Sequence, residues 1–327
     1  MTTATLKAVC AMAATAAGAA IADTAPTSAT PPSPAVDALV VISNGLLFAA
    51  ISPKGAELKS IRMGDFEYMW QKEADRPSGI ATVLFPICGS LYQGRYMFEG
   101  REYPLPGHGF ACRSLFRSER SPDGSCAVFT LESDDATKAM YPFDFSLTVA
   151  FQLAGPMLFV SATMRNTGAS TMPFAYGGHP GFNVPLGGEG RFEDWFLEFA
   201  PGSNPDAFEF GNGGLVTGRK HSLPLANGNR LPLRHDLFNG PGLFLDRSGG
   251  EVSLRSETST RSVTVRYPDM PNIGFWHTAG EASFLCIEPW AGLPSYDGVP
   301  DDFATRPNMI RLAPGTETTL RYSIEFH

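Results

Sequence analysis

FSLTVAFQLAGPMLFVSATMRN, residues 145–166, has the two-residue period of an extended chain. Apolar side chains alternate with polar or small ones across Phe145–Leu153, and a second apolar run covers Met157–Asn166. Such alternation places every second side chain on one face of a strand. Gly155 and Pro156 separate the two runs, and both residue types are typical of turns. The segment therefore predicts two consecutive strands joined by a turn.

The same texture continues on both sides of this segment, from Ala38 onward. Short apolar or alternating runs are separated by Gly, Pro, Asn and Asp, which is typical of a β-sandwich or β-barrel. Gly or Pro interrupts nearly every window long enough to show a helical period, so helices should be few and short. We expect an all-β fold with one domain over residues 37–327. Further strands are predicted at Leu39–Ser43, Leu46–Ile51, Glu57–Met63, Phe66–Trp70, Ala127–Ser133, Trp195–Phe199, Val252–Ser256, Ser262–Tyr267, Phe284–Glu288 and Thr318–Phe326.

Composition excludes several classes of partner. The chain has 327 residues, a formal charge of −8 and no run of Lys or Arg, so a phosphate backbone finds little to bind and nucleic acid is not expected. Beyond the N-terminal segment, no window offers the roughly 18 uninterrupted apolar residues of a membrane span. The sequence does not indicate an oligomeric state.

The first 36 residues differ from the rest of the chain. Lys7 precedes an uncharged, Ala-rich stretch, and small residues at Ala20 and Ala22 precede Asp23, which fits a signal peptide over residues 1–22. Residues 23–36 are rich in Pro, Ser, Thr and Ala and are expected to be a disordered linker. These features predict a periplasmic or secreted protein. A disordered extension on a cytoplasmic protein is the alternative, because the apolar stretch is mostly Ala.

The cysteines do not indicate a metal site or a disulfide framework. Cys88 and Cys286 lie in apolar, strand-like runs, where a free thiol acts as a small core residue. A chain of this length needs no disulfide framework, so no structural disulfide is expected. Paired CxxC spacing is absent from the sequence, and we therefore expect no structural metal.

Two of the six histidines have surroundings that suit a binding site. His108 lies in PLPGHGFACRS and His179 in PFAYGGHPGF, which are Gly/Pro-rich segments with aromatic neighbours that could wall a sugar pocket. A capping or turn hydrogen bond is the alternative for each. His277 follows Trp276 and would lie near a pocket only through that neighbour. The others are expected to be exposed: His221, His235 and His327.

Glu288 is the acid with the most unusual surroundings. It lies in ASFLCIEPWAG, an apolar run that predicts a buried strand ending at the acid, with Pro289 terminating it. Burial would raise the pKa of this carboxyl group and suit it to general-base chemistry near neutral pH. A buried arginine that pairs with the carboxylate is the alternative explanation.

Taken together, these segments resemble the aldose 1-epimerase family, and specifically its LacX-like bacterial branch. The resemblance covers most of the chain and rests on the order of SNGLLFAAISPKGAELKSI, EYMWQ, LFPICGSL, PGHGFA, YPFDF, MRNTGASTMPFAYGGHPGF and CIEPWAG. It implies a large antiparallel β-sandwich of the galactose mutarotase-like kind, with an open concave face for the sugar. It also implies interconversion of the α and β anomers of a free aldose, with no cofactor and no metal.

The resemblance assigns roles residue by residue. Glu288 would remove the proton from the anomeric hydroxyl, His179 would protonate the ring oxygen, and His108 would bind sugar hydroxyls. Trp276 and Trp290 are expected to line or support the sugar cleft. The sugar-binding aspartate of the family falls on either Asp246 or Asp236.

Two positions depart from the branch. It often carries arginines where this chain has Ser90 and Cys112, and Arg113 could not replace the second one if that segment were a strand. Three alternatives to a neutral-sugar epimerase remain open. They are a hexose-6-phosphate 1-epimerase, which would need cationic phosphate ligands, a non-catalytic carbohydrate-binding protein, and an enzyme that binds a metal through His108, His179 and Glu288.

The N-terminal segment gives a testable prediction. Protein purified from its native host should begin at or near Asp23, because cleavage is expected after Ala22. Mass spectrometry of the intact protein decides the point. An intact Met1 or Thr2 on the soluble protein would contradict export by cleavage.

Overall fold

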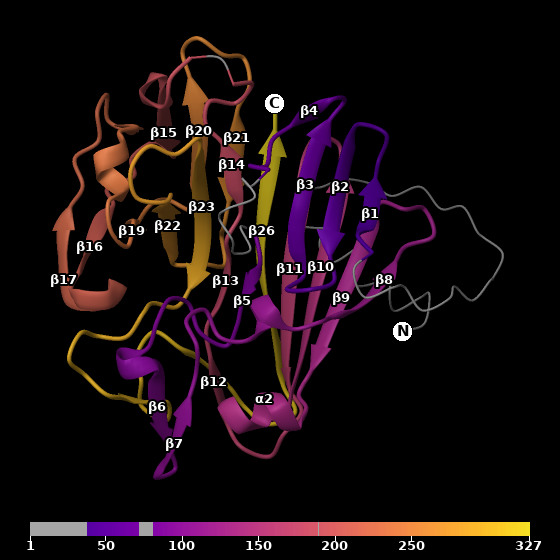
Figure 1. Ribbon diagram of the computed structural model, residues 1–327, viewed down its shortest axis with the longest axis vertical. Helices are drawn as coiled ribbons and strands as arrows, with labels where there is room; N and C mark the ends of the chain where they lie inside the picture. Colours follow the sequence, from indigo (N-terminus) through magenta and orange to yellow (C-terminus); the bar gives the residue numbers. More distant parts are fainter. Residues whose placement is uncertain (1–37, 72–80, 189) are drawn as a thin grey trace.

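The computed structural model describes residues 38–71, 81–188 and 190–327, so the predicted signal peptide and linker lie outside the described part. Within it, the chain is built mainly of antiparallel strands (Figure 1). The largest sheet has nine strands in the order β18-β15-β20-β21-β26-β11-β10-β9-β8. Their bounds are Arg230–Pro232, Trp195–Phe199, Glu251–Ser256, Val263–Arg266, Glu317–Phe326, Met157–Asn166, Phe145–Ala154, Cys126–Glu132 and Arg117–Arg120.

A second large sheet carries the residues that matter for function. Across the described residues its path is β17-β16-β19-β22-β23-β13-β5, and β14 also pairs with β23. In the order of that path, with β14 last, the bounds are Val216–Ser222, Asp206–Phe210, Leu243–Asp246, Asn272–Trp276, Phe284–Ala291, Tyr176–Gly178, Val83–Leu84 and Gly181–Asn183.

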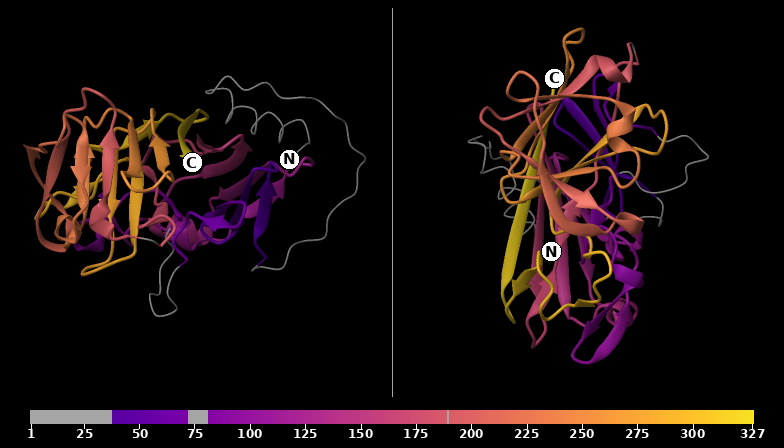
Figure 2. Two further views of the ribbon diagram at one scale, coloured as in Figure 1. Left: turned by 90° about the horizontal axis from the view of Figure 1, so that it is seen from above. Right: turned by 90° about the vertical axis from the view of Figure 1, so that its left-hand side faces the viewer.

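Smaller elements surround these two sheets. Strands β1 to β4 form a sheet at one side of the molecule, and β24, β6 and β7 form another near one end (Figure 1). The views in Figure 2 place the strands of residues from about 190 to 290 on the opposite side from the N-terminal strands. The remaining strands are β1 Val40–Ser43, β2 Leu47–Ser52, β3 Glu57–Met63, β4 Phe66–Glu67, β6 Arg95–Phe98, β7 Arg101–Pro104, β24 Asp301–Asp302, β12 Met172–Phe174 and β25 Ile310–Leu312.

The predicted pair of strands at 145–166 is confirmed. β10 pairs with β11 in one unbroken register, from Phe145 opposite Asn166 to Ala154 opposite Met157. The alternating apolar side chains of β10, including Phe145, Leu147 and Val149, are buried in the core. The all-β sandwich is therefore confirmed, and its period-two pattern is the physical reason.

Helices are few and short among the described residues, as expected. α2 covers Asp135–Met140, and a capping box fixes its start: the Asp134 side chain accepts the Thr137 N–H, and the Thr137 hydroxyl accepts the Asp134 N–H. The described part of the chain also has five 3₁₀ turns, η2 Tyr92–Gly94, η3 Ala111–Arg113, η4 Phe192–Asp194, η5 Asn212–Gly214 and η6 His235–Phe238. None of the described helices is long and apolar enough to cross a membrane.

Two expectations need correction. The strand predicted at Phe66–Trp70 extends only over Phe66–Glu67. β23 does not end at Glu288 but continues through Pro289 to Ala291. Among the described cysteines, the thiols of Cys88, Cys112 and Cys286 are free.

The two large sheets approach one another closely at Gly178 in β13. A Cβ atom at this position would lie 2.8 Å from the hydroxyl oxygen and 2.9 Å from Cζ of Tyr322, which belongs to β26. Glycine is therefore needed here for space. It is not needed for backbone conformation, since its φ is not in the left-handed region.

We expect Gly178→Ala to reduce the free energy of unfolding by about 1–3 kcal/mol, because overpacking forces neighbouring side chains from their rotamers. Urea denaturation monitored by fluorescence measures the change, with Ser118→Ala on the outer strand β8 as a control. Equal stability of the two variants would show that Tyr322 has room to move.

Candidate active site

The site forms where the neighbour of β23 is interrupted. β13 ends at Gly178 and β14 begins at Gly181, yet both pair with β23 in the same register. His179 therefore falls directly opposite Glu288, and the interruption leaves both side chains at the same point of the sheet. The backbone N–H of Ile287 donates to the carbonyl of Pro180 (2.9 Å). Backbone N–H groups alternate in direction along a strand, so the nitrogen of Pro289 points to the same side as the N–H of Ile287. Pro289 therefore lacks an N–H only at the edge of the interruption, which explains how the strand continues through a proline.

His179 and Glu288 form a pair of ionisable groups at this interruption. His179 Nε2 lies 3.3 Å from Glu288 Oε1, and the side chains are 13% and 1% exposed, respectively. On the other side of β23, Gly274 lies opposite Glu288, and a Cβ there would be 2.2 Å from the ring of Phe244. An acid and an imidazole at this separation can exchange protons with one bound molecule.

Burial dominates the electrostatics of Glu288. Desolvation raises the pKa of its carboxyl group well above the usual range, and an interaction with the indole of Trp290 opposes this shift in part. The Trp290 N–H does not meet the geometry of a hydrogen bond, and within the described residues Glu288 Oε2 has no hydrogen-bond partner. Among the described residues, no arginine forms an ion pair with Glu288, so a pairing arginine does not explain the buried acid. The carboxylate is a stronger base than an ordinary surface glutamate.

His108 approaches the pair from a different segment. It has a positive φ of 63°, between Gly107 and Gly109, and its ring lies 5.7 Å from the ring of His179 and 5.8 Å from that of Trp290. The Gly89 N–H donates to His108 Nδ1 (3.2 Å), so the proton of the neutral ring resides on Nε2. Desolvation, reinforced by His179 and Arg113, lowers the pKa of His108 to about 3, which keeps the ring neutral.

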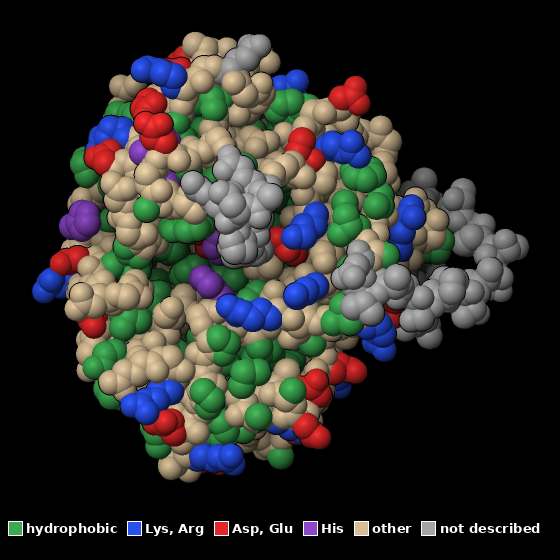
Figure 3. Space-filling model, in the orientation of Figure 1, with side chains coloured by type: hydrophobic (Ala, Val, Ile, Leu, Met, Phe, Trp, Pro, Cys, Tyr) green, Lys and Arg blue, Asp and Glu red, His purple; other side chains and the backbone are tan. Residues whose placement is uncertain are grey.

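His108, His179 and Glu288 line one cavity of about 700 Å³. Trp276 lies in its wall with its ring 5.9 Å from that of His179, and Trp290, Phe244 and Phe284 also line it. The structure thus brings together His108, His179, Trp276 and Glu288 from four separate segments. Figure 3 shows histidine side chains at the bottom of a hollow, beside Lys and Arg side chains.

The two aspartates lie elsewhere. Asp236, in the turn η6, is exposed and pairs with Arg234 (2.9 Å). Asp246, in β19, pairs with Lys220 and is not part of the cavity lining. Neither aspartate is among the residues that line the cavity of His179 and Glu288, and both form ion pairs with cations.

The segment after His108 is a 3₁₀ turn, η3, and not a strand. Arg113 is therefore not directed away from the site by strand alternation. Cys112 and Arg113 both line the cavity, as does Ser90. The Arg113 guanidinium donates to the carbonyls of Gly109 (3.0 Å) and Gly107 (3.3 Å), which anchors the loop that carries His108.

Sequence reasoning missed the cationic side of the cavity. Lys54 and Lys59, around the turn from β2 to β3, line it together with Arg113, and Lys59 pairs with Glu57 (2.6 Å). Both lysines are exposed in a hairpin, where lysines are common, and no sequence motif marks them as site residues. Their relation to His179 depends on contacts between segments more than a hundred residues apart in the sequence.

One group of side chains has donors that could hold a metal ion. Ligand atoms of His179, Cys286 and Glu288 lie within 4.8 Å of one another. His108, which the sequence suggested as a ligand, does not belong to this group. Burial and the neighbouring Glu288 raise the pKa of the Cys286 thiol well above its usual range, which disfavours the thiolate that a metal prefers.

Comparison with known proteins places this geometry in context. Residues 38–300 match the family model described as aldose 1-epimerase. The plasmid-encoded protein LacX of Lactococcus lactis subsp. lactis is 29% identical over 300 residues, which cover 87% of this chain and 98% of LacX. A galactose mutarotase related enzyme from Lactobacillus acidophilus superimposes with a TM-score of 0.82 at 30% identity, covering 88% of this chain and 97% of that one. A galactose mutarotase-like protein from Lactobacillus casei ATCC 334 gives the same TM-score at 32% identity, with 88% and 100% coverage.

Burial of Glu288 makes stability depend on pH. The folded state raises the pKa of this group, so the folded protein binds its proton more tightly than the unfolded chain. The resulting stability is fully present below the unfolded pKa, about 4.3, and is lost as the pH rises through the raised value.

We therefore expect the wild type to lose stability relative to Glu288→Gln as the pH rises from 4 to 8. Urea denaturation at several pH values measures the difference. Glu132→Gln, at the end of β9, is the control for the exchange of a carboxyl group for an amide. A difference between wild type and Glu288→Gln that stays constant over this range would contradict the raised pKa.

Proposed function

Because the chain belongs to the aldose 1-epimerase family, we propose that it interconverts the α and β anomers of a free aldose by acid–base ring opening and reclosure. The observation that carries the proposal is the pair of His179 Nε2 and Glu288 Oε1, 3.3 Å apart at the bottom of a cavity large enough for a sugar. Similar structures that are described as a galactose mutarotase related enzyme and a galactose mutarotase-like protein support a sugar as the substrate.

Ring opening needs one proton removed and one delivered at two oxygens bonded to the same carbon. Glu288 accepts the proton of the anomeric hydroxyl while His179 protonates the ring oxygen, and the bond between C1 and the ring oxygen breaks to give the free aldehyde. Rotation about C1–C2 presents the other face of the carbonyl. Reclosure with the reverse proton transfers restores both groups, so no net proton or electron is consumed.

The surroundings of the pair suit these roles. Burial strengthens Glu288 as a base, and it strengthens each hydrogen bond that the sugar makes inside the cavity. His108 keeps its Nε2 proton free to donate to a sugar oxygen, because Nδ1 accepts from Gly89. Trp276 offers an aromatic surface for the apolar face of the ring.

A hexose 6-phosphate is the second candidate substrate, and one observation favours it. Lys54, Lys59 and Arg113 line the cavity, whereas Ser90 and Cys112 stand where the branch often has arginines. Cations from other positions could therefore hold an anionic group. The two candidates differ in the charge of the substrate, which an experiment can vary.

Exchange NMR on a panel of free and 6-phosphorylated aldoses, against the uncatalysed rate, tests activity and substrate class together. We expect acceleration of the free sugars that EDTA leaves unchanged. Acceleration of the phosphorylated sugars alone would favour the second candidate. Loss of activity in EDTA with recovery on adding zinc would favour the metal-binding alternative.

Variants at the pair test the mechanism. Glu288→Gln keeps the size of the side chain but cannot accept the anomeric proton, so turnover should fall by about 10²–10⁴-fold. His179→Gln should cause a similar loss, and the double variant should lose much less than the product of the two, because both groups act on one ring opening. A folded Glu288→Gln protein with near-normal anomer exchange would contradict the mechanism and favour a role in binding alone.

A further inference from the structure

Two side chains of β23 each hold a buried polar atom without a hydrogen-bond partner. Trp290 Nε1 and Glu288 Oε2 are buried, and neither meets a partner among the residues that the structure describes. Because side chains alternate along a strand, both project to the same face, roughly 7 Å apart along the chain. An indole N–H and a carboxylate oxygen are complementary, and leaving both unpaired costs free energy that a bond between them would recover.

The neighbouring strands hold the two side chains on one side of β23. Gly177 of β13 lies opposite Trp290, and a Cβ there would be 2.6 Å from Cδ1 and 3.1 Å from Nε1 of the indole. The N–H edge of the ring therefore lies over β13, the strand whose interruption leaves room for the carboxyl group. On the side of β22, the ring of Phe244 fills the space above Gly274, opposite Glu288, and packs on the ring of Trp290 with centroids 4.4 Å apart. Phe244 thus keeps both side chains from turning toward β22.

The titratable groups closest to the carboxyl group do not compete for Oε2. His179 Nε2 lies 3.3 Å from Oε1, the other oxygen of Glu288. Burial, reinforced by Glu288, raises the pKa of the thiols of Cys88 and Cys286 well above the usual range. Burial lowers the pKa of His108 to about 3, so this ring and the two thiols are neutral near neutral pH.

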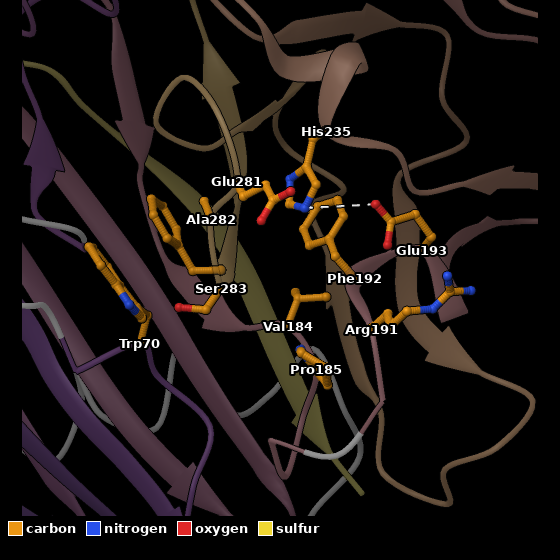
Figure 4. Close-up of a pocket in the computed structure, with 11 residues that line it drawn as sticks. Trp70, Val184, Pro185, Arg191, Phe192, Glu193, His235, Glu281, Ala282 and Ser283 are labelled. Atoms are coloured by element: carbon orange, nitrogen blue, oxygen red, sulfur yellow. Dashed lines mark ion pairs between the residues drawn. The ribbon is translucent and has the colours of Figure 1, made fainter.

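The charged and titratable groups farther out belong to the cavity walls. Those of the active-site cavity are Lys54, Glu57, Lys59 and Arg113. The adjacent cavity of about 490 Å³ is lined by a different set, which Figure 4 shows around a separate hollow: Arg191, Glu193, His235 and Glu281. Neither Glu288 nor Trp290 lines that second hollow. The indole N–H of Trp290 is therefore the donor placed to reach Oε2.

We propose that Trp290 is a positioning residue, whose indole N–H donates to Glu288 Oε2 when the carboxylate is charged and so turns Oε1 toward the sugar. This inference rests on the proposed function, in which Glu288 accepts the anomeric proton. With Oε2 held, that proton goes to Oε1, the oxygen beside His179, and base and acid act from adjacent atoms. The bond favours the charged carboxylate, in keeping with the way the indole opposes the effect of burial on the pKa of Glu288.

The pH dependence of anomer exchange tests the role. Trp290→Phe keeps an aromatic ring but removes the N–H that stabilises the charged carboxylate, so the pKa of Glu288 rises further. The acidic limb of kcat/KM for free aldoses, corrected for uncatalysed exchange, should move up by about 1–2 pH units. Below the limb kcat/KM should fall by about 10- to 100-fold, and above it the variant should approach the wild type. Trp195→Phe, which removes a buried indole from β15 in the other large sheet, is the matched control.

The indole resonance of Trp290 tests the contact without an activity assay. The chain has four tryptophans, so its ¹H–¹⁵N spectrum has four indole signals, and the one missing from Trp290→Phe belongs to Trp290. We expect this signal to move downfield as the pH rises through the pKa of Glu288, in the wild type and in His179→Gln, but not in Glu288→Gln. If Trp290→Phe does not fold, variants at the other three tryptophans assign the signal by elimination.

The outcomes separate this inference from the proposed function. An indole signal that is indifferent to Glu288 would overturn the hydrogen bond. An unchanged pH profile in Trp290→Phe, or a loss of equal size at every pH, would overturn the positioning role while the epimerase activity stands. If the wild type accelerates no sugar, the proposed function fails and the positioning role with it, and the indole signal still decides whether the two groups are bonded.

Discussion

The site depends on one constraint, which is that a carboxyl group lies inside a β-sheet. Glu288 is surrounded by neighbours that leave it space but provide little solvation: Gly274 opposite it on one side, Trp290 two residues along, and His179 across the interruption between β13 and β14. An uncompensated buried charge is expensive. The fold tolerates this arrangement because the large core around it, built by the two main sheets, supplies stability elsewhere, while the base itself remains poorly solvated and reactive.

One face of one strand organises the cavity. Because side chains alternate, Phe284, Cys286, Glu288 and Trp290 project to the same side of β23. Phe284 lies in the cavity wall, Glu288 is the proposed base, and Trp290 lies beside His108. Cys286 completes the row as a buried thiol with a raised pKa. The strand's register against β13, β14 and β22 therefore sets the relative positions of groups that serve different purposes.

The sequence was most informative where a pattern is local. Period-two alternation predicted the strands β3, β11 and β15 with their observed bounds, and an acid at the end of an apolar run identified Glu288. Tertiary context determined the rest. Pro289 continues a strand because its missing N–H faces an interruption that only the folded sheet reveals. Lys54 and Trp70 reach the cavity through hairpins without any motif.

The placement of His179 opposite Glu288, between two strands that both pair with β23, has a consequence for inactivation. Their separation is set by the backbone ladder of β23, whose spacing of about 4.8 Å is fixed by peptide hydrogen bonds and not by the closing of a loop. A site of this kind has no intermediate state in which the protein is folded but its reactive groups have drifted apart. Heat or denaturant must open the central strands to separate them, so catalytic competence and the cooperative structure of the sheet are lost in the same transition.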